Sequence, residues 1–228
     1  MIHDDEPFGQ LLSRRKAIAL LGASGAALLA NAVNAAPACV VRPQQTEGPF
    51  FVDGDLHRSD IRGAKAGTPL ALTLTISRLQ KNDCAPLPEA QVDLWHCDAA
   101  GVYSGVHDGQ FNTAGQTFLR GYQSTNERGE VRFVTIYPGW YPGRTVHLHF
   151  KVRARGSRQR AQEFTSQLYF DDAMTDIVHA ARPYGGTARQ RMRNQDDWIF
   201  RRGGDQLQLD VAKSGDMLAA SFALAMQF

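Results

Sequence analysis

The stretch Tyr137-Pro-Gly-Trp-Tyr-Pro-Gly-Arg-Thr-Val-His-Leu-His-Phe-Lys-Val152 contains two histidines, His147 and His149, that are separated by a single leucine. Apolar residues alternate with the histidines, and this alternation predicts a β-strand. Side chains two positions apart on a strand point to the same face. Both imidazoles would therefore lie on one face, where they can share a metal ion.

The same alternation recurs on both sides of this stretch, with glycine- and proline-containing turns between the runs. Short strands separated by such turns predict an all-β fold, an antiparallel β-sandwich, that forms a single domain over residues 39–228. A helix is expected only in the N-terminal segment and at residues 172–181. The strands are expected at residues 70–77, 90–95, 129–136, 145–152, 165–170, 205–211 and 221–226.

Residues 1–38 have the pattern of a targeting signal followed by a short lead segment. Ser13-Arg14-Arg15-Lys16 precedes a weakly apolar run over residues 17–32, and small residues follow that run. The paired arginines indicate the twin-arginine route and an exported protein, periplasmic or extracellular. A membrane anchor and a lipoprotein attached at Cys39 are the alternatives. The run is short for an anchor, and no second long apolar segment follows, so stable membrane insertion is not expected after signal removal.

The composition of the chain is that of a globular protein, with 43% hydrophobic residues, 21% charged residues and a net charge of +2. No basic stripe alternates with aromatic residues, so a nucleic-acid partner is not expected. Three cysteines allow one disulfide and one free thiol. Cys39 and Cys84 lie in expected loops and are the preferred pair, whereas Cys97 ends an expected strand. The sequence does not decide whether the protein forms a homo-oligomer. Residues 221–228 could pair with a second copy at a sheet edge.

Two tyrosines accompany the histidine pair: Tyr141 shortly before it and Tyr103 further upstream. The pKa of a phenol is about 10, so a tyrosine binds a metal well only where a strongly Lewis-acidic ion removes its proton. Ferric iron is such an ion, and hard anionic oxygen ligands favour Fe(III) over Fe(II). A site with two tyrosines and two histidines would keep a position open for an anion or hydroxide.

Six segments resemble, in order, the intradiol ring-cleavage dioxygenases, the catechol and protocatechuate dioxygenase family. The combination of a Tyr-Pro pair with Arg-x-x-His-x-His is specific, whereas His-x-His alone is not. The segments are Thr46-Glu-Gly-Pro-Phe50, residues 88–104 with Trp-His-Cys-Asp-Ala-Ala-Gly-Val-Tyr103, Phe118-Leu-Arg-Gly121, Pro138-Gly-Trp-Tyr-Pro142, Arg144-Thr-Val-His-Leu-His-Phe150 and Gln167-Leu-Tyr-Phe170.

The resemblance implies an Fe(III) cofactor and a reaction in which O2 is inserted between the two hydroxylated carbons of a catechol-type substrate, giving a cis,cis-muconate-type product. The implied ligands of the iron are Tyr103, Tyr141, His147 and His149. Arg144 aligns with an arginine that lies against the bound ring and stabilises negative charge on it. Gln167 aligns with a glutamine near that ring. Tyr141 is expected to take a proton from the substrate.

Two other functions fit parts of the same pattern. A zinc-dependent hydrolase could use the pair His147 and His149, but no Asp or Glu ligand is obvious nearby. A non-catalytic β-sandwich that binds carbohydrate, aromatic compounds or protein would hold no stoichiometric metal. Three further histidines, His57, His96 and His107, are metal-ligand candidates by residue type alone. Trp95 and Trp198 are expected in the hydrophobic core.

Overall fold

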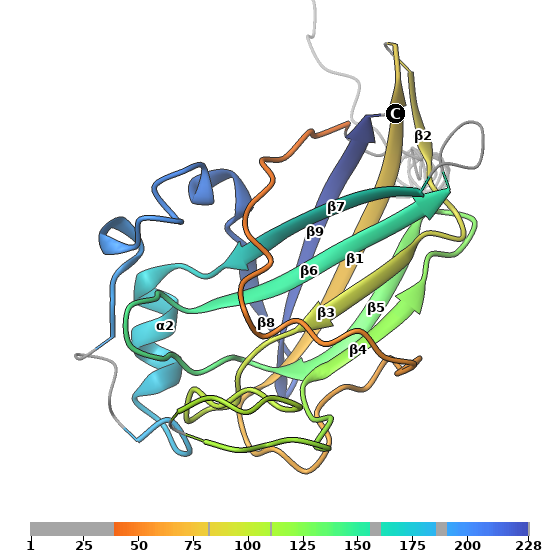
Figure 1. Ribbon diagram of the computed structural model, residues 1–228. Coiled ribbons are helices and arrows are strands. Elements are labelled where there is room, and N and C mark those ends of the chain that lie inside the picture. The colour runs from red at the N-terminus through yellow and green to blue at the C-terminus, as the bar shows by residue number, and fades with distance from the viewer. Residues whose placement is uncertain (1–38, 82, 110, 156–160, 186–190, 228) are drawn as a thin grey trace, which may run out of the picture. The chain divides into compact units, whose positions relative to one another are not determined.

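Strands dominate the part of the chain that this computed structural model describes, which is residues 39–228 apart from 82, 110, 156–160, 186–190 and 228. They form two sheets (Figure 1). The signal and lead segment predicted for residues 1–38 lies outside the described residues. Within those residues, no helix combines the length and the apolar character needed to cross a bilayer.

The first sheet has the strand order β2-β1-β9-β8, and β5 also pairs with β1. Its strands are β1 (Pro69–Gln80), β2 (Asp83–Pro86), β5 (Glu130–Ile136), β8 (Asp210–Ser214) and β9 (Met217–Gln227). Every pair is antiparallel except β1 with β9, which is parallel. The strand β9 is antiparallel to β8, its hairpin partner, and therefore runs in the same direction as β1.

The second sheet has the order β4-β3-β6-β7 and is antiparallel throughout. Its strands are β3 (Gln91–Trp95), β4 (Arg120–Ser124), β6 (His147–Arg155) and β7 (Ala161–Tyr169). β7 leads into the helix α2 (Asp172–His179), which lies beside the start of β6 in Figure 1. Two short 3-10 helices follow, η3 (Asn194–Asp196) and η4 (Gly204–Leu207).

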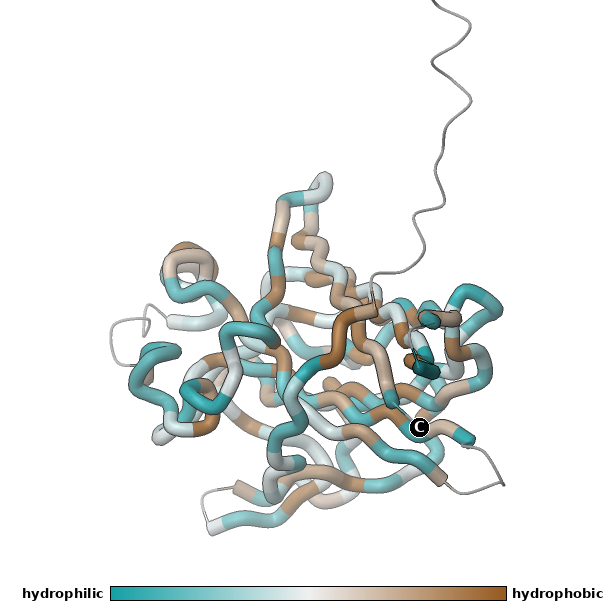
Figure 2. The backbone as a smooth tube through the Cα atoms, turned by 90° about the horizontal axis from the view of Figure 1, so that it is seen from above, coloured by the Kyte–Doolittle hydropathy of each residue, from teal (hydrophilic) through white to brown (hydrophobic). Residues whose placement is uncertain are grey.

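The hydrophobic core lies between the two sheets and confirms the predicted β-sandwich. Alternate residues of β1 are buried on one face, and Figure 2 shows hydrophobic and hydrophilic residues alternating along the backbone. Phe150 on β6 contacts Phe222 on β9, with ring centroids 5.9 Å apart, so the second sheet packs on the first. At about 25 cal/mol per Å2 of buried apolar surface, this core is the main source of stability.

The predicted strands are largely confirmed, with one error and two omissions. Residues 204–207 form the 3-10 helix η4 where a strand was expected to begin at 205, and the strand that follows is β8. Gly203, with a φ of 93°, precedes η4 and interrupts the extended chain. β2 and β4 were not predicted, because neither carries an apolar alternation: β2 is largely exposed and β4 has the sequence RGYQS.

Strand β6 is buried on both faces, which a two-layer sandwich does not explain by itself. The second face is covered by residues 43–57, which we call the strap. The strap runs across β7, β6, β3 and β4 and is the orange segment in Figure 1. Its backbone bonds to β7 at Gln45 N and Thr165 O (3.0 Å) and to β4 at Tyr122 N and Leu56 O (2.9 Å). The histidines of β6 point into this covered face.

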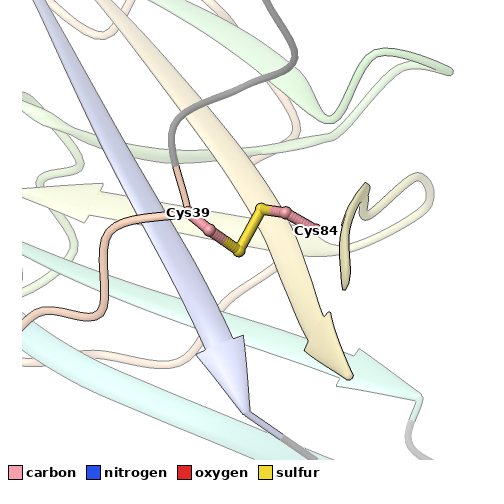
Figure 3. Close-up of a disulfide and its surroundings, with 2 residues drawn as sticks. All are labelled: Cys39 and Cys84. Atoms are coloured by element: carbon pink, nitrogen blue, oxygen red, sulfur yellow. A yellow bond between two sulfur atoms is a disulfide. The ribbon is translucent and has the colours of Figure 1, made fainter. Parts of the chain in front are cut away.

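A disulfide between Cys39 and Cys84 fastens the chain just before the strap to β2 (Figure 3). The preferred pairing is thereby confirmed, and Cys97 is a free, buried cysteine. The bridge closes a loop with a sequence separation of 45 residues that contains the whole strap. Disulfides of this kind persist in oxidising compartments.

Replacing both bridged cysteines, Cys39→Ser with Cys84→Ser, is expected to lower the free energy of unfolding by about 4 kcal/mol, since the unfolded chain regains the entropy of an open loop of this length. Urea unfolding with and without reductant measures the change. Reductant should destabilise the wild-type protein by a similar amount and leave the double variant unchanged. Equal unfolding midpoints for all four samples would contradict a bridge that stabilises the fold.

Candidate metal centre

His147 and His149 stand at the start of β6 on the face covered by the strap, as the alternation predicts. Their Nε2 atoms are 3.1 Å apart, and both side chains are buried. His147 Nδ1 lies 2.6 Å from the carbonyl of Thr145 and must donate to it, so the Nε2 atom of neutral His147 presents its lone pair to the site. Such a second bond fixes the ring orientation of metal-binding histidines.

Tyr103 reaches the same place from the loop after β3. A turn closed by the Asp98 carboxylate, which accepts from Ala100 N (2.9 Å) and Val102 N (3.0 Å), directs the chain towards the strap face. Gly101 has a φ of 83°, and a Cβ there would lie 2.3 Å from the Trp140 carbonyl oxygen, so the turn requires glycine. Tyr103 is fully buried, and its hydroxyl has no hydrogen-bond partner within the described chain.

Tyr141 comes from the loop between β5 and β6. Its hydroxyl lies 3.3 Å from His147 Nε2, and its ring centroid lies 5.7 Å from that of Tyr103. The helix α2 anchors the start of this loop, since His179 Nε2 donates to the carbonyl of Pro138 (2.9 Å). Tyr141 is only partly buried. It is therefore the more accessible of the two tyrosines.

The donor set formed by these four side chains fits a ferric ion. Two imidazoles and two phenols converge in a buried space, and the orphaned hydroxyl of Tyr103 lacks the partner that a buried polar group normally has. No group of three or more His, Cys, Asp or Glu side chains in the described residues is placed to hold a metal. The other donors that lie at the histidine pair are the hydroxyl groups of Tyr103 and Tyr141, and phenol oxygens favour Fe(III) over zinc.

Burial sets the charge of this site in the absence of a metal. It lowers the pKa of His147 and of His149 well below the usual imidazole range, so both rings are neutral near pH 7. It also raises the pKa of Tyr103 well above that of a free phenol, with the nearby Tyr141 adding to the effect. Both phenols are consequently protonated in the metal-free protein, and a bound cation would have to displace their protons.

Arg144 lies beside the four side chains and is held from two sides. Its Nε donates to Asp197 Oδ2 (2.9 Å), one terminal nitrogen bonds to Gln167 Oε1, and the other lies 3.4 Å from His147 Nε2. Gln167, on β7, also donates to the carbonyl of Thr46 in the strap (3.0 Å). The structure therefore brings Arg144 and Gln167 together with the predicted iron ligands.

Asp197 is a residue of this site that the sequence did not reveal. It is fully buried, and besides Arg144 it accepts from Thr145 N (2.9 Å) and from Ile199 N (2.8 Å). One carboxylate thus fixes both the guanidinium and the backbone that leads into β6. The only signal in the sequence is an Asp-Asp-Trp turn, which resembles an ordinary surface loop.

Aromatic and glycine contacts complete the wall behind the ligands. The ring of Trp95 stacks on His149, with centroids 5.1 Å apart and planes 10° apart. Phe50 of the strap stacks on Tyr103 at 4.4 Å. A Cβ at Gly48, whose φ is 73°, would lie 3.2 Å from the His149 ring, so the strap approaches this histidine closely only because position 48 is glycine.

The other candidates from the sequence lie outside this group. His96 is buried and bonded at both nitrogens, to the Cys97 carbonyl (2.8 Å) and to Thr135 Oγ1 (2.6 Å). His57 packs on Tyr122, and His107 takes part in a β-bridge with Asn112. Of the two tryptophans, Trp95 is in the core as expected, but the prediction for Trp198 was wrong. Trp198 comes directly after Asp197 in the chain and is 52% exposed.

Comparison with known proteins agrees with this arrangement. The sequence profile of a protein family described as Dioxygenase matches residues 46–201. The solved structure of an intradiol ring-cleavage dioxygenase from Tetranychus urticae superimposes with a TM-score of 0.75 at 32% identity, covering 83% of this chain and 95% of that one.

Curated relatives match more locally. A hydroxyquinol 1,2-dioxygenase from Nocardioides simplex is 30% identical over 132 residues, 49% of this chain and 42% of the relative. A catechol 1,2-dioxygenase from Acinetobacter baylyi is 31% identical over 143 residues, 51% of this chain and 43% of the relative. The chain thus spans about half the length of these curated relatives. With the profile covering more than half of its residues, the chain belongs to the intradiol ring-cleavage dioxygenase family.

Proposed function

We propose that the protein is an Fe(III)-dependent intradiol dioxygenase. It inserts O2 between the two hydroxylated carbons of a catechol-type substrate and forms a cis,cis-muconate-type product. The observation that carries the proposal is the convergence of two phenols and two imidazoles beside a fixed arginine. Family membership supports the same reaction class.

Bound Fe(III) would supply the Lewis acidity and one-electron chemistry that make an aromatic ring reactive towards O2. Tyr103, Tyr141, His147 and His149 would hold it. The ring carbon–carbon bond between the two hydroxyl-bearing carbons breaks, and each of these carbons gains one oxygen atom from O2. Since both atoms of O2 enter the product, no external reductant is required.

The residues of the chain itself bind the substrate and move its protons. Tyr141 is the more accessible tyrosine, so its phenolic oxygen is the one placed to accept a proton from a substrate hydroxyl. Arg144 presents a fixed positive charge where negative charge develops on the ring, and Asp197 and Gln167 keep it from rotating away. The strap covers this face of β6 and limits access of water.

The proposal is tested on purified protein by three measurements: iron per chain, visible absorption and product analysis under 18O2. One iron per chain, a red-purple tyrosinate-to-iron absorption band and a product with two labelled oxygen atoms are expected. Catechol, protocatechuate, hydroxyquinol and chlorocatechols form the substrate panel. Stoichiometric zinc in a colourless protein would favour the hydrolase alternative, and absence of any metal would favour a non-catalytic module.

The change Tyr141→Phe is expected to retain more iron than Tyr103→Phe but to slow turnover by about 100-fold, since general base catalysis by one residue contributes about that much. Tyr103 and the histidine pair remain to hold the metal. Stopped-flow spectra should show a slower loss of substrate protons on binding. Unchanged turnover, or complete loss of iron, would contradict this division of roles between the two tyrosines.

We also propose that the protein acts outside the cytoplasm. The signal-like residues 1–38 and the Cys39–Cys84 bridge support this location. Fractionation of cells that produce the full chain tests it, with Arg14→Lys and Arg15→Lys together as the control that blocks twin-arginine export. Equal cytoplasmic retention of both forms would overturn the proposal.

A further inference from the structure

Arg120, the first residue of β4, is a buried cation without an acidic partner. It is 5% exposed, and no Asp or Glu within the described chain lies at ion-pair distance from it. All its hydrogen bonds go to neutral acceptors, which are Ser104 Oγ (2.9 Å), the Ser104 carbonyl and the Phe50 carbonyl (3.3 Å). Burial lowers the pKa of Arg120 to about 10, which still leaves it charged at neutral pH. A buried charge is normally paired.

The two residues that accept hydrogen bonds from Arg120, Ser104 and Phe50, are both neighbours of Tyr103. Ser104 follows Tyr103 in the chain, and Phe50 stacks on the Tyr103 ring at 4.4 Å with planes 24° apart. Arg120 therefore joins the strap to the loop that carries Tyr103. Thr113 adds a further anchor, since its Oγ1 donates to the Tyr103 carbonyl (2.6 Å).

Within the described residues, the Arg120 guanidinium has no acidic partner and the Tyr103 hydroxyl has no hydrogen-bond partner, and a Tyr103 phenolate would be close enough to raise the pKa of Arg120. The geometry links the two groups through one loop, because Ser104, which accepts from Arg120, is the residue next to Tyr103. A tyrosine that binds a metal does so as an anion, and an anion beside Arg120 would balance its charge in a region of low dielectric. A Tyr103 bound to a metal would have a partner for its oxygen and would supply negative charge near Arg120.

We propose that Arg120 is a positioning residue of the metal centre, which locks the Tyr103 loop to the strap and balances the negative charge of the ligand set. The inference rests on the proposed function, because it assumes that Tyr103 binds Fe(III). It assigns to the Phe118-Leu-Arg-Gly121 segment an electrostatic role as well as a structural one.

The test compares Arg120→Met and Arg120→Lys in iron-loaded protein. Loss of a positive charge favours Fe(III) over Fe(II), so the Met variant should have a lower Fe(III)/Fe(II) midpoint potential than the wild type. Its tyrosinate absorption band should move to longer wavelength, because the phenolate loses a stabilising charge. Arg120→Lys keeps the charge and loses most of the hydrogen bonds, so its potential should stay close to that of the wild type. Arg120→Gln, neutral but able to donate, replaces the Met variant if that variant does not fold.

Arg58→Met is the matched control. Arg58 also bonds to carbonyl oxygens, those of Thr117 and Arg120, but it has no bond to the Tyr103 loop. Its potential and band should be unchanged. Equal potentials in the Met, Lys and wild-type proteins would overturn the charge-balancing role, and so would a shift in Arg58→Met as large as in Arg120→Met. A wild-type protein that binds no iron would overturn the proposed function as well, so the two failures are distinguishable.

Discussion

The change Tyr103→Phe should have opposite effects on the iron-free and iron-loaded protein. The hydroxyl of Tyr103 is buried without a partner, and an unsatisfied buried group destabilises a fold by about 1–3 kcal/mol. Phenylalanine removes that group without leaving a cavity. The iron-free variant should therefore be more stable than the iron-free wild type by about 1 kcal/mol.

Iron binding should suffer in the same variant. Loss of a residue that only supports a metal ligand typically weakens metal binding by about 10–100-fold, so loss of a ligand should exceed about 100-fold. The red-purple absorption and the turnover of catechol should be largely lost. Urea unfolding of chelator-treated protein measures the first effect, and iron content after gel filtration measures the second.

Tyr137→Phe is the matched control for a buried tyrosine. Its hydroxyl is bonded to Thr175 Oγ1 (2.7 Å), so this variant should lose stability by about 1 kcal/mol and keep its iron and colour. The assignment of Tyr103 as a ligand is wrong if Tyr103→Phe retains full colour, or if the two variants behave alike.

The sequence predicts the fold well where side chains alternate against a common core. β1, β3, β5 and β9 each overlap an expected strand, since their apolar residues meet in one layer between the sheets. It does not predict β2, which contributes no core residue and exists because β1 continues beyond the core to pair with it. Pairings between distant strands, such as β1 with β9, leave no local pattern at all.

The same distinction holds for the site. The histidine pair is predictable because period two on a strand fixes its common face, and the structure shows that face on β6. Burial of this face is not predictable from β6 itself, because the strap that covers it comes from residues 43–57. Arg120 and Asp197 are charged residues without a local pattern, and their importance follows only from which groups surround them. The ligand motif is local, whereas its electrostatic support is not.

Asp197→Ala should disable the site without removing a ligand. Asp197 lies 53 positions after Arg144 in the chain and bonds to that arginine. It forms no hydrogen bond to the side chains of the four proposed iron ligands in the described structure. Its removal leaves a largely buried guanidinium without its carboxylate and three backbone N–H groups unpaired, which is expected to lower the free energy of unfolding by about 3–5 kcal/mol. The isosteric change Asp197→Asn should lower stability less, because its single amide oxygen can still accept either from Arg144 or from Ile199, but not from both.

The change Asp197→Asn should lower kcat more than it lowers the iron content of the protein. A displacement of about 1 Å in a positioned group can lower the rate by about 100-fold, so kcat should drop to that extent while iron content and the absorption band of the resting protein persist. Asp196→Asn is the control, since it makes the same chemical change at an exposed neighbour and should leave both properties intact. Steady-state kinetics with iron quantified in each sample measures the effect. Loss of iron in proportion to activity would mean that Asp197 supports the metal ligands themselves, and unchanged kcat would mean that Arg144 does not need its carboxylate partner for the reaction.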